Sequence, residues 1–169
     1  MTARPHARPV PGRRPPGERL FSRLAGRMAP PGMREIAAAP RTRPELAGLR
    51  RHSLLVTFRR DGTPVPTPVW AAPSDGRLYV RTARASGKVA RLRRDARALV
   101  APCSARGRPL GDPFEAIARV LPLEREEVAE RALRDAYGVG RALFEWSVDL
   151  VRVDMCYLEL EPGAWRASL

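Results

Sequence analysis

Residues 57–88, TFRRDGTPVPTPVWAAPSDGRLYVRTARASGK, decide the fold because they predict three strands in succession and then the start of a short helix. The apolar, β-branched run 53–59 ends at DG, residues 61–62, a dipeptide typical of two-residue hairpins. A second strand begins near Pro64, and SDG at 74–76 turns the chain into a third strand, RLYVRT. This order predicts a three-stranded antiparallel meander.

The second strand carries prolines at positions 64, 66 and 68, which share one face of an extended chain. The valines at 65 and 69 share the other face with Thr67. Proline has no N–H to donate to a neighbouring strand. We therefore expect this segment to lie at an edge of the sheet, or to direct its N–H side at a ligand.

The periodicity changes after the third strand, at ASGKVARLRRD, residues 85–95. Ser86 is suited to the N-cap of a helix, and Gly87 lets a ligand approach the backbone. Lys88 adds a point charge to the unpaired N–H groups of the first turn. These features predict an anion site, and a solvated basic helix capped by serine is the alternative.

The remaining residues continue the same mixture of strands and helices. Strands are expected at 97–103, 114–122 and 153–162, where apolar residues alternate or run together. A helix is expected at 124–138, with acids in its first turn and a glycine at its end, and a shorter helical piece at 141–146. The total is about six strands and two or three helices in one domain.

The phrases TFRRDGTPVPTPVW and YVRTARASGKVARLRRDARALVAPCSARGRPLG resemble the split β-barrel flavin- and deazaflavin-binding proteins related to pyridoxamine 5'-phosphate oxidase. The likeness is greatest to the actinobacterial F420-dependent oxidoreductase branch and covers residues 44–165. It implies a mainly β fold with some α: a six-stranded antiparallel split β-barrel, the FMN-binding split barrel, with two or three helices. It also implies a homodimer with cofactor sites at the interface.

The resemblance implies a role for each residue that matches the family pattern. A serine and a lysine at the start of the helix after the third strand hold the cofactor phosphate in this family, and Ser86 and Lys88 match them. Gly87 stands where pyridoxamine phosphate oxidases typically have arginine, which argues against the vitamin B6 reaction. The implied cofactor-binding residues are Thr67, Pro68, Val69 and Trp70 along the ring, Thr82, Ser86, Gly87 and Lys88 near the phosphate, and Arg91 and Arg94 toward the tail.

Two alternatives to these roles stay open: Trp70 as core or dimer interface, and the arginines as a solvated face. For the whole protein, the resemblance implies hydride transfer between the deazaflavin F420 and a small organic acceptor. An FMN enzyme, a haem or tetrapyrrole binder, and a cofactor carrier without turnover are alternatives on the same fold. A nucleic-acid-binding protein is less favoured, because aromatic residues are sparse and no nucleic-acid motif is present.

The sequence lacks the patterns of nucleophilic and metal-dependent catalysis. It has two histidines, His6 and His52, and its two cysteines, Cys103 and Cys156, have no metal-ligand spacing. There is no glycine-rich nucleotide loop. The tyrosines at 79, 137 and 157 are unsupported as proton donors, so we assign no catalytic residue and no metal.

The formal net charge of +13 is uneven, with 11 arginines and 3 acids in residues 1–50. We predict that residues 1–41 are a disordered Arg/Pro-rich extension, with a short helix at 18–28, and that residues 42–169 form the cofactor-binding barrel. Translation from Met28 or Met33 is a further hypothesis, and a basic arm for anionic partners is its alternative. No run resembles a secretory signal or a membrane span, so we expect a cytoplasmic protein with reduced thiols.

Overall fold

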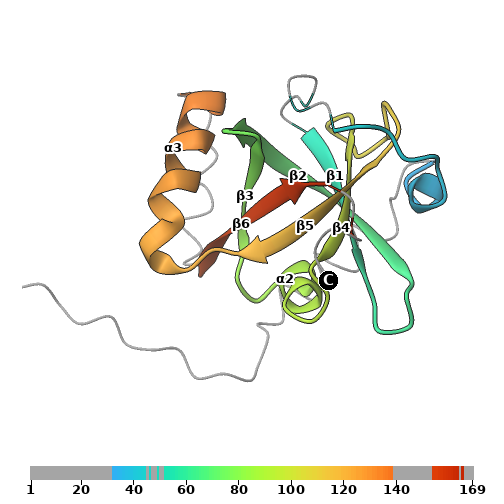
Figure 1. Cartoon of the computed structure of the whole chain (residues 1–169), viewed down its shortest axis with the longest axis horizontal. Coiled ribbons are helices and arrows are strands. Elements are labelled where there is room, and N and C mark those ends of the chain that lie inside the picture. The colour runs from blue at the N-terminus through green and yellow to red at the C-terminus, as the bar shows by residue number, and fades with distance from the viewer. Residues whose placement is uncertain are drawn as a thin grey trace, which may run out of the picture.

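The computed structural model describes residues 32–44, 46, 49, 52–138, 154–163 and 165. The strands are β1 (His52–Phe58), β2 (Pro64–Ser74), β3 (Arg77–Ala83), β4 (Arg97–Pro102), β5 (Phe114–Val120) and β6 (Met155–Pro162). They close an antiparallel barrel in the order β1-β2-β3-β6-β5-β4 (Figure 1). The expected fold, a six-stranded antiparallel barrel with helices, is confirmed.

The helices of the described part are two α-helices, α2 (Gly87–Leu92) and α3 (Glu126–Tyr137), and two short 3-10 helices, η1 (Glu35–Ala37) and η2 (Leu123–Arg125). The predicted helix at 124–138 corresponds to α3 with η2 before it, and Gly138 ends it at φ 52°. The helical pieces predicted at 18–28 and 141–146 lie outside the described residues. No helix in the described ranges is both long and apolar enough to cross a membrane.

The two hairpins differ in a way that the sequence only half predicts. Asp75 and Gly76 both have positive φ, 49° and 72°, as a two-residue turn of the mirror-image type requires. The turn between β1 and β2 was predicted to have two residues, and this was wrong. The Arg59 amide donates to Thr63 O, so three residues lie between them, with Gly62 at φ 80°. A type I turn followed by a left-handed glycine closes such a loop.

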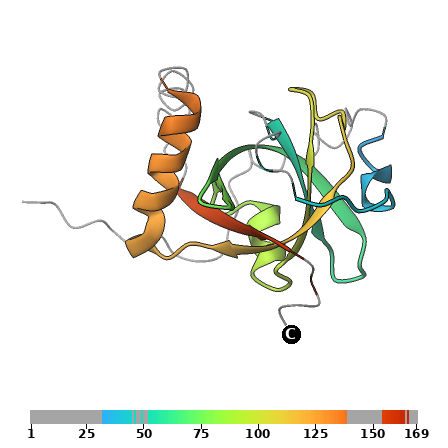
Figure 2. The same cartoon turned by 45° about the horizontal axis from the view of Figure 1, so that its top comes forward.

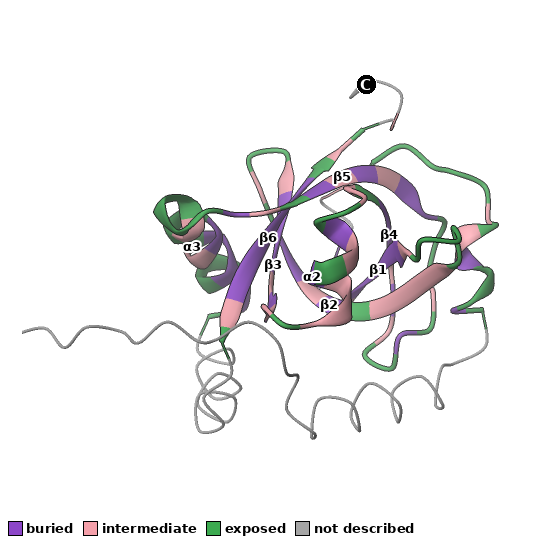
Figure 3. Cartoon of the chain, turned by 90° about the horizontal axis from the view of Figure 1, so that it is seen from below, coloured by how far each residue is buried: buried purple, intermediate pink, exposed green. Residues whose placement is uncertain are grey.

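The barrel interior is the main core, and α2 closes one end of it. Inward residues of β5, Phe114, Ala116 and Ala118, share this core with the buried face of α2, Val89 and Leu92. Seen from below, α2 lies within the ring of strands (Figure 3). The alternation predicted for β5 and the helical face predicted for α2 are therefore confirmed.

Two further apolar layers lie outside the barrel, on opposite sides of it (Figure 2). α3 covers one side, where its buried alanines and Leu133 pack against Tyr79 of β3 and Tyr157 of β6. On the other side, Met33 and Ile36 pack against outward residues of β1 and β4. Met33 and Ile36 belong to the predicted extension, residues 1–41, and their side chains are buried against the barrel. Residues 1–31 lie outside the described part.

The ends of three strands differ slightly from the predictions. β4 ends at Pro102, and Cys103 instead forms an isolated bridge with Pro109. β5 ends at Val120 rather than Pro122, because the chain leaves the sheet to begin η2. The described part of β6 begins at Met155, and residues 151–153 lie outside the described part.

Candidate cofactor site

The first part of β2 has a strand partner on one edge and, within the described residues, none on the other. β2 pairs with β1 from Pro64 to Trp70, whereas its pairing with β3 covers only residues 71–74. Because Pro64, Pro66 and Pro68 cannot donate, the regular ladder to β1 must use the alternate residues between them. The backbone nitrogen and carbonyl groups of the prolines therefore face the edge that β3 leaves open, as the edge-strand prediction requires.

The predicted ring-binding residues of β2 lie on both faces of this strand. Val69 is buried in the barrel core, so a ligand along the strand edge can contact its backbone but not its side chain. Pro68 is exposed on the outer face, and Thr67 and Trp70 are half-buried. Trp70 stacks edge-on against His52, with 6.0 Å between ring centroids, and lies 5.5 Å from the Tyr137 ring.

β3 separates from β2 after Val80 and leads toward the start of α2. Its last residues, 81–83, pair with β6 and have no β2 partner. Thr82 is buried there, and Lys88 Nζ donates to its Oγ1 over 2.8 Å. The side chain of Lys88, which the sequence predicts near the phosphate, therefore reaches from α2 to the end of β3 that has separated from β2.

Ser86 is the N-cap residue of α2, as predicted, but its hydroxyl does not cap the helix. Ser86 Oγ is buried and has no hydrogen-bond partner among the described residues. A buried hydroxyl without a partner costs on the order of 1 to 3 kcal/mol. A serine oxygen held in this state, two residues before Lys88, is suited to a ligand atom that completes its hydrogen bonding.

Arg91 and Gly87 are joined by a contact that the sequence did not reveal. Arg91 Nε donates to Thr57 Oγ1 over 2.7 Å, and Thr57 is fully buried in β1. The same guanidinium lies so close to Gly87 that a Cβ on that glycine would meet Nη1 at 3.0 Å. Gly87 thus permits a close approach, which in this structure is made by Arg91.

The corner is formed by Thr82, Ser86, Lys88 and Arg91. It lies where residues 81–83 of β3 have separated from β2, on the side of the open edge of β2. Thr57 connects the corner to the other edge of β2, where it pairs with Val65. Thr57 was missed as a site residue. The sequence feature that could have identified Thr57 is a hydroxyl residue at an inward position in the otherwise apolar run LLVTF.

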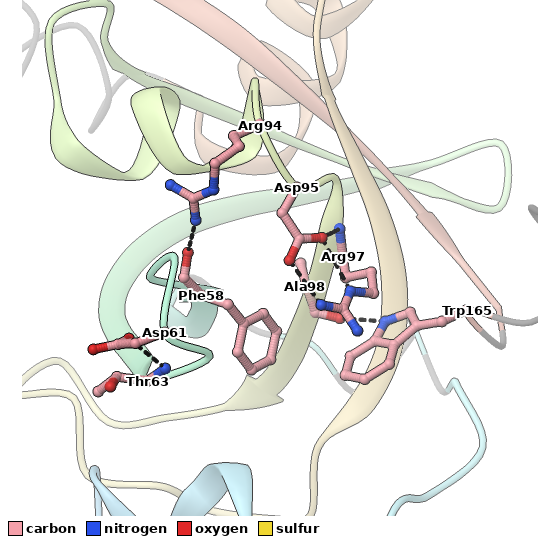
Figure 4. Close-up of polar contacts among 8 residues, drawn as sticks. All are labelled: Phe58, Asp61, Thr63, Arg94, Asp95, Arg97, Ala98 and Trp165. Atoms are coloured by element: carbon pink, nitrogen blue, oxygen red, sulfur yellow. Dashed lines mark hydrogen bonds and ion pairs between the residues drawn. The ribbon is translucent and has the colours of Figure 1, made fainter.

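Arg94, which the sequence predicted to contact the cofactor tail, hydrogen-bonds to the end of β1. Its Nη2 donates to Phe58 O over 2.6 Å, at the point where β1 ends (Figure 4). Beside it, Asp95 binds Arg97, whose guanidinium carbon lies 5.8 Å from the Phe58 ring centroid and 5.4 Å from that of Trp165. The Arg94 side chain is exposed.

The tyrosines lie away from this corner, beneath or against α3. Tyr79 OH donates to the buried Glu159, Tyr137 OH to Ala71 O, and Tyr157 OH to Glu130. Burial raises the pKa of Tyr79, with Glu159 adding to the effect. The hydroxyls of Tyr137 and Tyr157 thus fix α3 to the sheet, and the hydroxyl of Tyr79 is engaged between β3 and β6.

Metal chemistry and reactive thiols find no support in the described part of the chain. No group of three histidine, cysteine, aspartate or glutamate side chains gathers there with metal-binding geometry. Both cysteines are buried and unpaired. Burial raises the pKa of Cys103 to about 11, which keeps this thiol protonated and unreactive at neutral pH.

No protein-family model matches this sequence, and no curated protein matches it. Solved structures do match its fold. A conserved hypothetical protein from Mycobacterium tuberculosis is 22% identical, with a TM-score of 0.50 over 68% of this chain and 74% of that chain. HutZ, the haem storage protein from Vibrio cholerae, is 14% identical, with a TM-score of 0.51 over 68% and 83%.

A haem-binding protein from Mycobacterium smegmatis is 19% identical, with a TM-score of 0.51 over 79% of this chain and 52% of that chain. Identities at this level show a shared fold alone. The expected likeness to split-barrel proteins is confirmed as a fold: a closed antiparallel barrel of the same type, with a short helix at one end.

Proposed function

We propose that this protein is an oxidoreductase that binds F420 along the open edge of β2 and transfers hydride between the deazaflavin and a small organic acceptor. The observation that carries the proposal is the buried Ser86 Oγ, which has no partner among the described residues and stands two residues before Lys88. Together they offer a hydroxyl and an ammonium to a phosphate. The edge of β2, with Pro68 and Trp70 on its outer face, offers an apolar surface for the ring.

The residues of the corner fit the phosphate-bearing part of such a cofactor. Lys88 is held by Thr82, so its ammonium needs little reordering to meet an anion. Arg91 adds positive charge from the same helix, and Arg94 extends it toward the β1–β2 turn. A bound deazaflavin supplies hydride chemistry, and this chain contributes orientation, charge and exclusion of water.

We further propose that the protein acts as a homodimer, in which a second copy covers the outer side of the ring on β2. The support is the exposed Pro68 and the half-buried Trp70, which leave an apolar surface beside the open edge of β2. A monomeric protein that still binds the cofactor would overturn this part of the proposal. Sedimentation analysis with and without F420 measures it directly.

FMN and haem are alternative ligands, each favoured by one observation. FMN has a phosphate that would suit the same corner. For haem, His52 is a candidate ligand; it is the one histidine within the described residues, and its ring contacts Trp70 edge-on. Two of the matching solved structures are described as haem storage or haem-binding proteins. Imidazole is a common axial ligand of haem iron.

The decisive experiment is a parallel titration of the purified protein with F420, FMN and haem, followed by fluorescence or absorbance. Selective binding of F420 supports the proposal and justifies a screen of acceptors for turnover. Preference for FMN or haem would keep the fold and replace the cofactor. Absence of binding would overturn the proposed function.

Lys88→Ala tests the site within the same titration. We expect cofactor affinity to fall roughly ten- to a hundredfold, because a charge-assisted contact worth about 1 to 3 kcal/mol is lost. The control is Arg93→Ala, which removes the same charge from an exposed position at the end of α2. Equal affinities of both variants would contradict the assignment of Lys88.

A further inference from the structure

Arg84 lies in the turn between β3 and α2, two residues before Ser86, and its half-buried side chain makes polar contacts with three residues. Its Nε lies 3.1 Å from Oδ2 and 3.2 Å from Oδ1 of Asp154. Its Nη2 donates to Met155 O over 3.0 Å and lies 3.6 Å from Glu126 Oε1. The backbone contributes as well, since Arg84 N donates to Asp154 O over 2.9 Å.

These contacts tie the turn to two elements that are distant in the sequence. Asp154 and Met155 stand at the start of β6, and Glu126 is the first residue of α3. Two carboxylates face the guanidinium, so much of its charge is compensated within the fold. Arg84 is therefore poorly suited to bind an anion itself and well suited to hold the turn that carries Ser86 and Lys88.

We propose that Arg84 is a positioning residue for the cofactor phosphate, an inference that rests on the proposed function. By fixing the β3–α2 turn to β6 and α3, it keeps Ser86 Oγ and Lys88 Nζ in the geometry that receives the phosphate. Lys88 contacts Thr82, whose neighbour across β6 is Cys156, one residue beyond Met155. The start of α2 is thus tied to β3 through Thr82, and the turn before it is tied to β6 through Asp154 and Met155.

Loss of the Arg84 contacts should act locally. Exposed ion pairs add little to global stability, and the Asp154 carboxylate is 57% exposed. A turn that is free to sample other conformations, however, must be ordered when the ligand binds, and this cost lowers affinity. Loss of Arg84 should therefore weaken phosphate binding while unfolding changes little.

The test compares a phosphate-bearing cofactor with the same ring system lacking the phosphate, using F420 or FMN, whichever the wild-type protein binds. Arg84→Gln should weaken the phosphate-bearing ligand about fivefold. The phosphate-free ring should change less than about twofold, because its contacts lie on β2. The control is Arg119→Gln, which removes an exposed ion pair with Glu161 elsewhere on the barrel. Equal weakening of both ligands would overturn the proposal.

Asp154→Ala separates positioning from direct contact, because the two roles predict opposite signs. This substitution removes negative charge near the corner, so an Arg84 that bound the phosphate directly would bind it more tightly. An Arg84 that positions the turn loses its anchor, and the phosphate-bearing ligand should bind about three- to fivefold more weakly. Tighter or unchanged binding would reject the positioning role.

Hydrogen exchange gives a readout that needs no ligand. In Arg84→Gln, the amides of Arg84 and Ser86, which donate to Asp154 O and Ala83 O, should exchange at least about fivefold faster. Amides in the centre of β1 should be unchanged. If the wild-type protein binds no cofactor, the proposed function fails, and exchange alone decides whether Arg84 holds the turn. Unaltered exchange at residues 84–88 would reject the positioning role.

Discussion

The α2 corner and the polar layer beneath α3 both place charged and hydroxyl groups against the barrel, but they differ in how completely these groups are satisfied. Beneath α3, Glu159 accepts hydrogen bonds from Arg77, Tyr79 and Arg125, and its side chain is only 5% exposed. At the corner, Ser86 Oγ is buried without a partner among the described residues.

This difference separates a polar cluster that holds the fold from one that is suited to a ligand. A buried network whose members satisfy one another adds rigidity and offers nothing to a ligand. A buried hydroxyl that lacks a partner is costly in the free protein and gains from a ligand that supplies the missing bond. The comparison predicts that substitutions under α3 change stability, whereas substitutions at the corner change binding.

The largest expected effect is on stability, from Glu159→Gln. Loss of the carboxylate charge leaves Arg77 and Arg125 without their ion pair, and breaking such a buried pair is strongly destabilising. Because both arginines reach water, we expect a loss of roughly 2 to 3 kcal/mol, somewhat less than for fully buried ions. Urea denaturation measures it.

The matched control is Glu161→Gln on the same strand, where the pair with Arg119 is exposed on both sides. Its cost should stay below about 0.5 kcal/mol. Cofactor affinity should be unchanged in both variants. A large loss of affinity in Glu159→Gln would break the comparison, because it would connect the layer under α3 to binding.

Ser86→Ala should produce opposite changes in stability and binding. Removing a buried oxygen without a partner should leave the free protein as stable or up to about 1 kcal/mol more stable, while cofactor affinity falls roughly three- to tenfold. Thermal unfolding of the free protein and titration with the cofactor measure the two effects. A loss of stability would show that this hydroxyl already has a structural role.

Ser104→Ala serves as the control, because Ser104 Oγ accepts a hydrogen bond from the Arg108 amide. The same chemical change should there reduce stability slightly, by about 0.5 to 1 kcal/mol, and leave affinity unaltered.

The smallest expected effect concerns Asp95 and Arg97, beyond the end of α2. Hydrogen bonds from Arg97 hold the pKa of Asp95 below its ordinary value of 3.8. The stabilisation is therefore present above that value and is lost as the pH falls through the lower pKa of the folded state. Because Arg97 is half-exposed, the loss should be under about 1 kcal/mol.

In Asp95→Asn, this part of the acid dependence should disappear. Stability measured from pH 5 down to pH 2 should fall less steeply than in the wild-type protein, with cofactor affinity at neutral pH unchanged. Identical slopes would show that Asp95 contributes nothing to the acid limb. This variant sharpens the comparison by testing a satisfied cluster just beyond the helix that forms the corner.

Local sequence patterns predicted the strands and helices, but they did not predict contacts between residues that are distant in the sequence. Alternation in β5 identified the inward residues, and the spacing of Val89 and Leu92 identified the buried face of α2. The pairings of Arg91 with Thr57 and of Arg84 with Asp154 join residues 34 and 70 positions apart. No periodicity within one segment carries such information.

The burial of Met33 and Ile36, inside the predicted extension, escaped the sequence for a different reason. Met33 and Ile36 stand in a stretch rich in proline and alanine, without the repeated apolar spacing that predicts a packed segment. Their burial against β1 and β4 depends on an apolar outer barrel face that becomes visible only when the strands are assembled. Likewise, the sequence predicted Ser86 as N-cap, but not that its hydroxyl would leave the helix uncapped.

The three alternate prolines of β2 have a consequence for how the protein behaves at high concentration. Exposed strand edges recruit other strands and are common starting points of aggregation. An edge with carbonyl groups but no N–H groups at Pro64, Pro66 and Pro68 can accept hydrogen bonds and cannot complete a ladder with an incoming strand. The edge of β2 where we propose that the cofactor binds is thereby closed to β-sheet growth, so the chain can leave it unpaired without seeding fibrils.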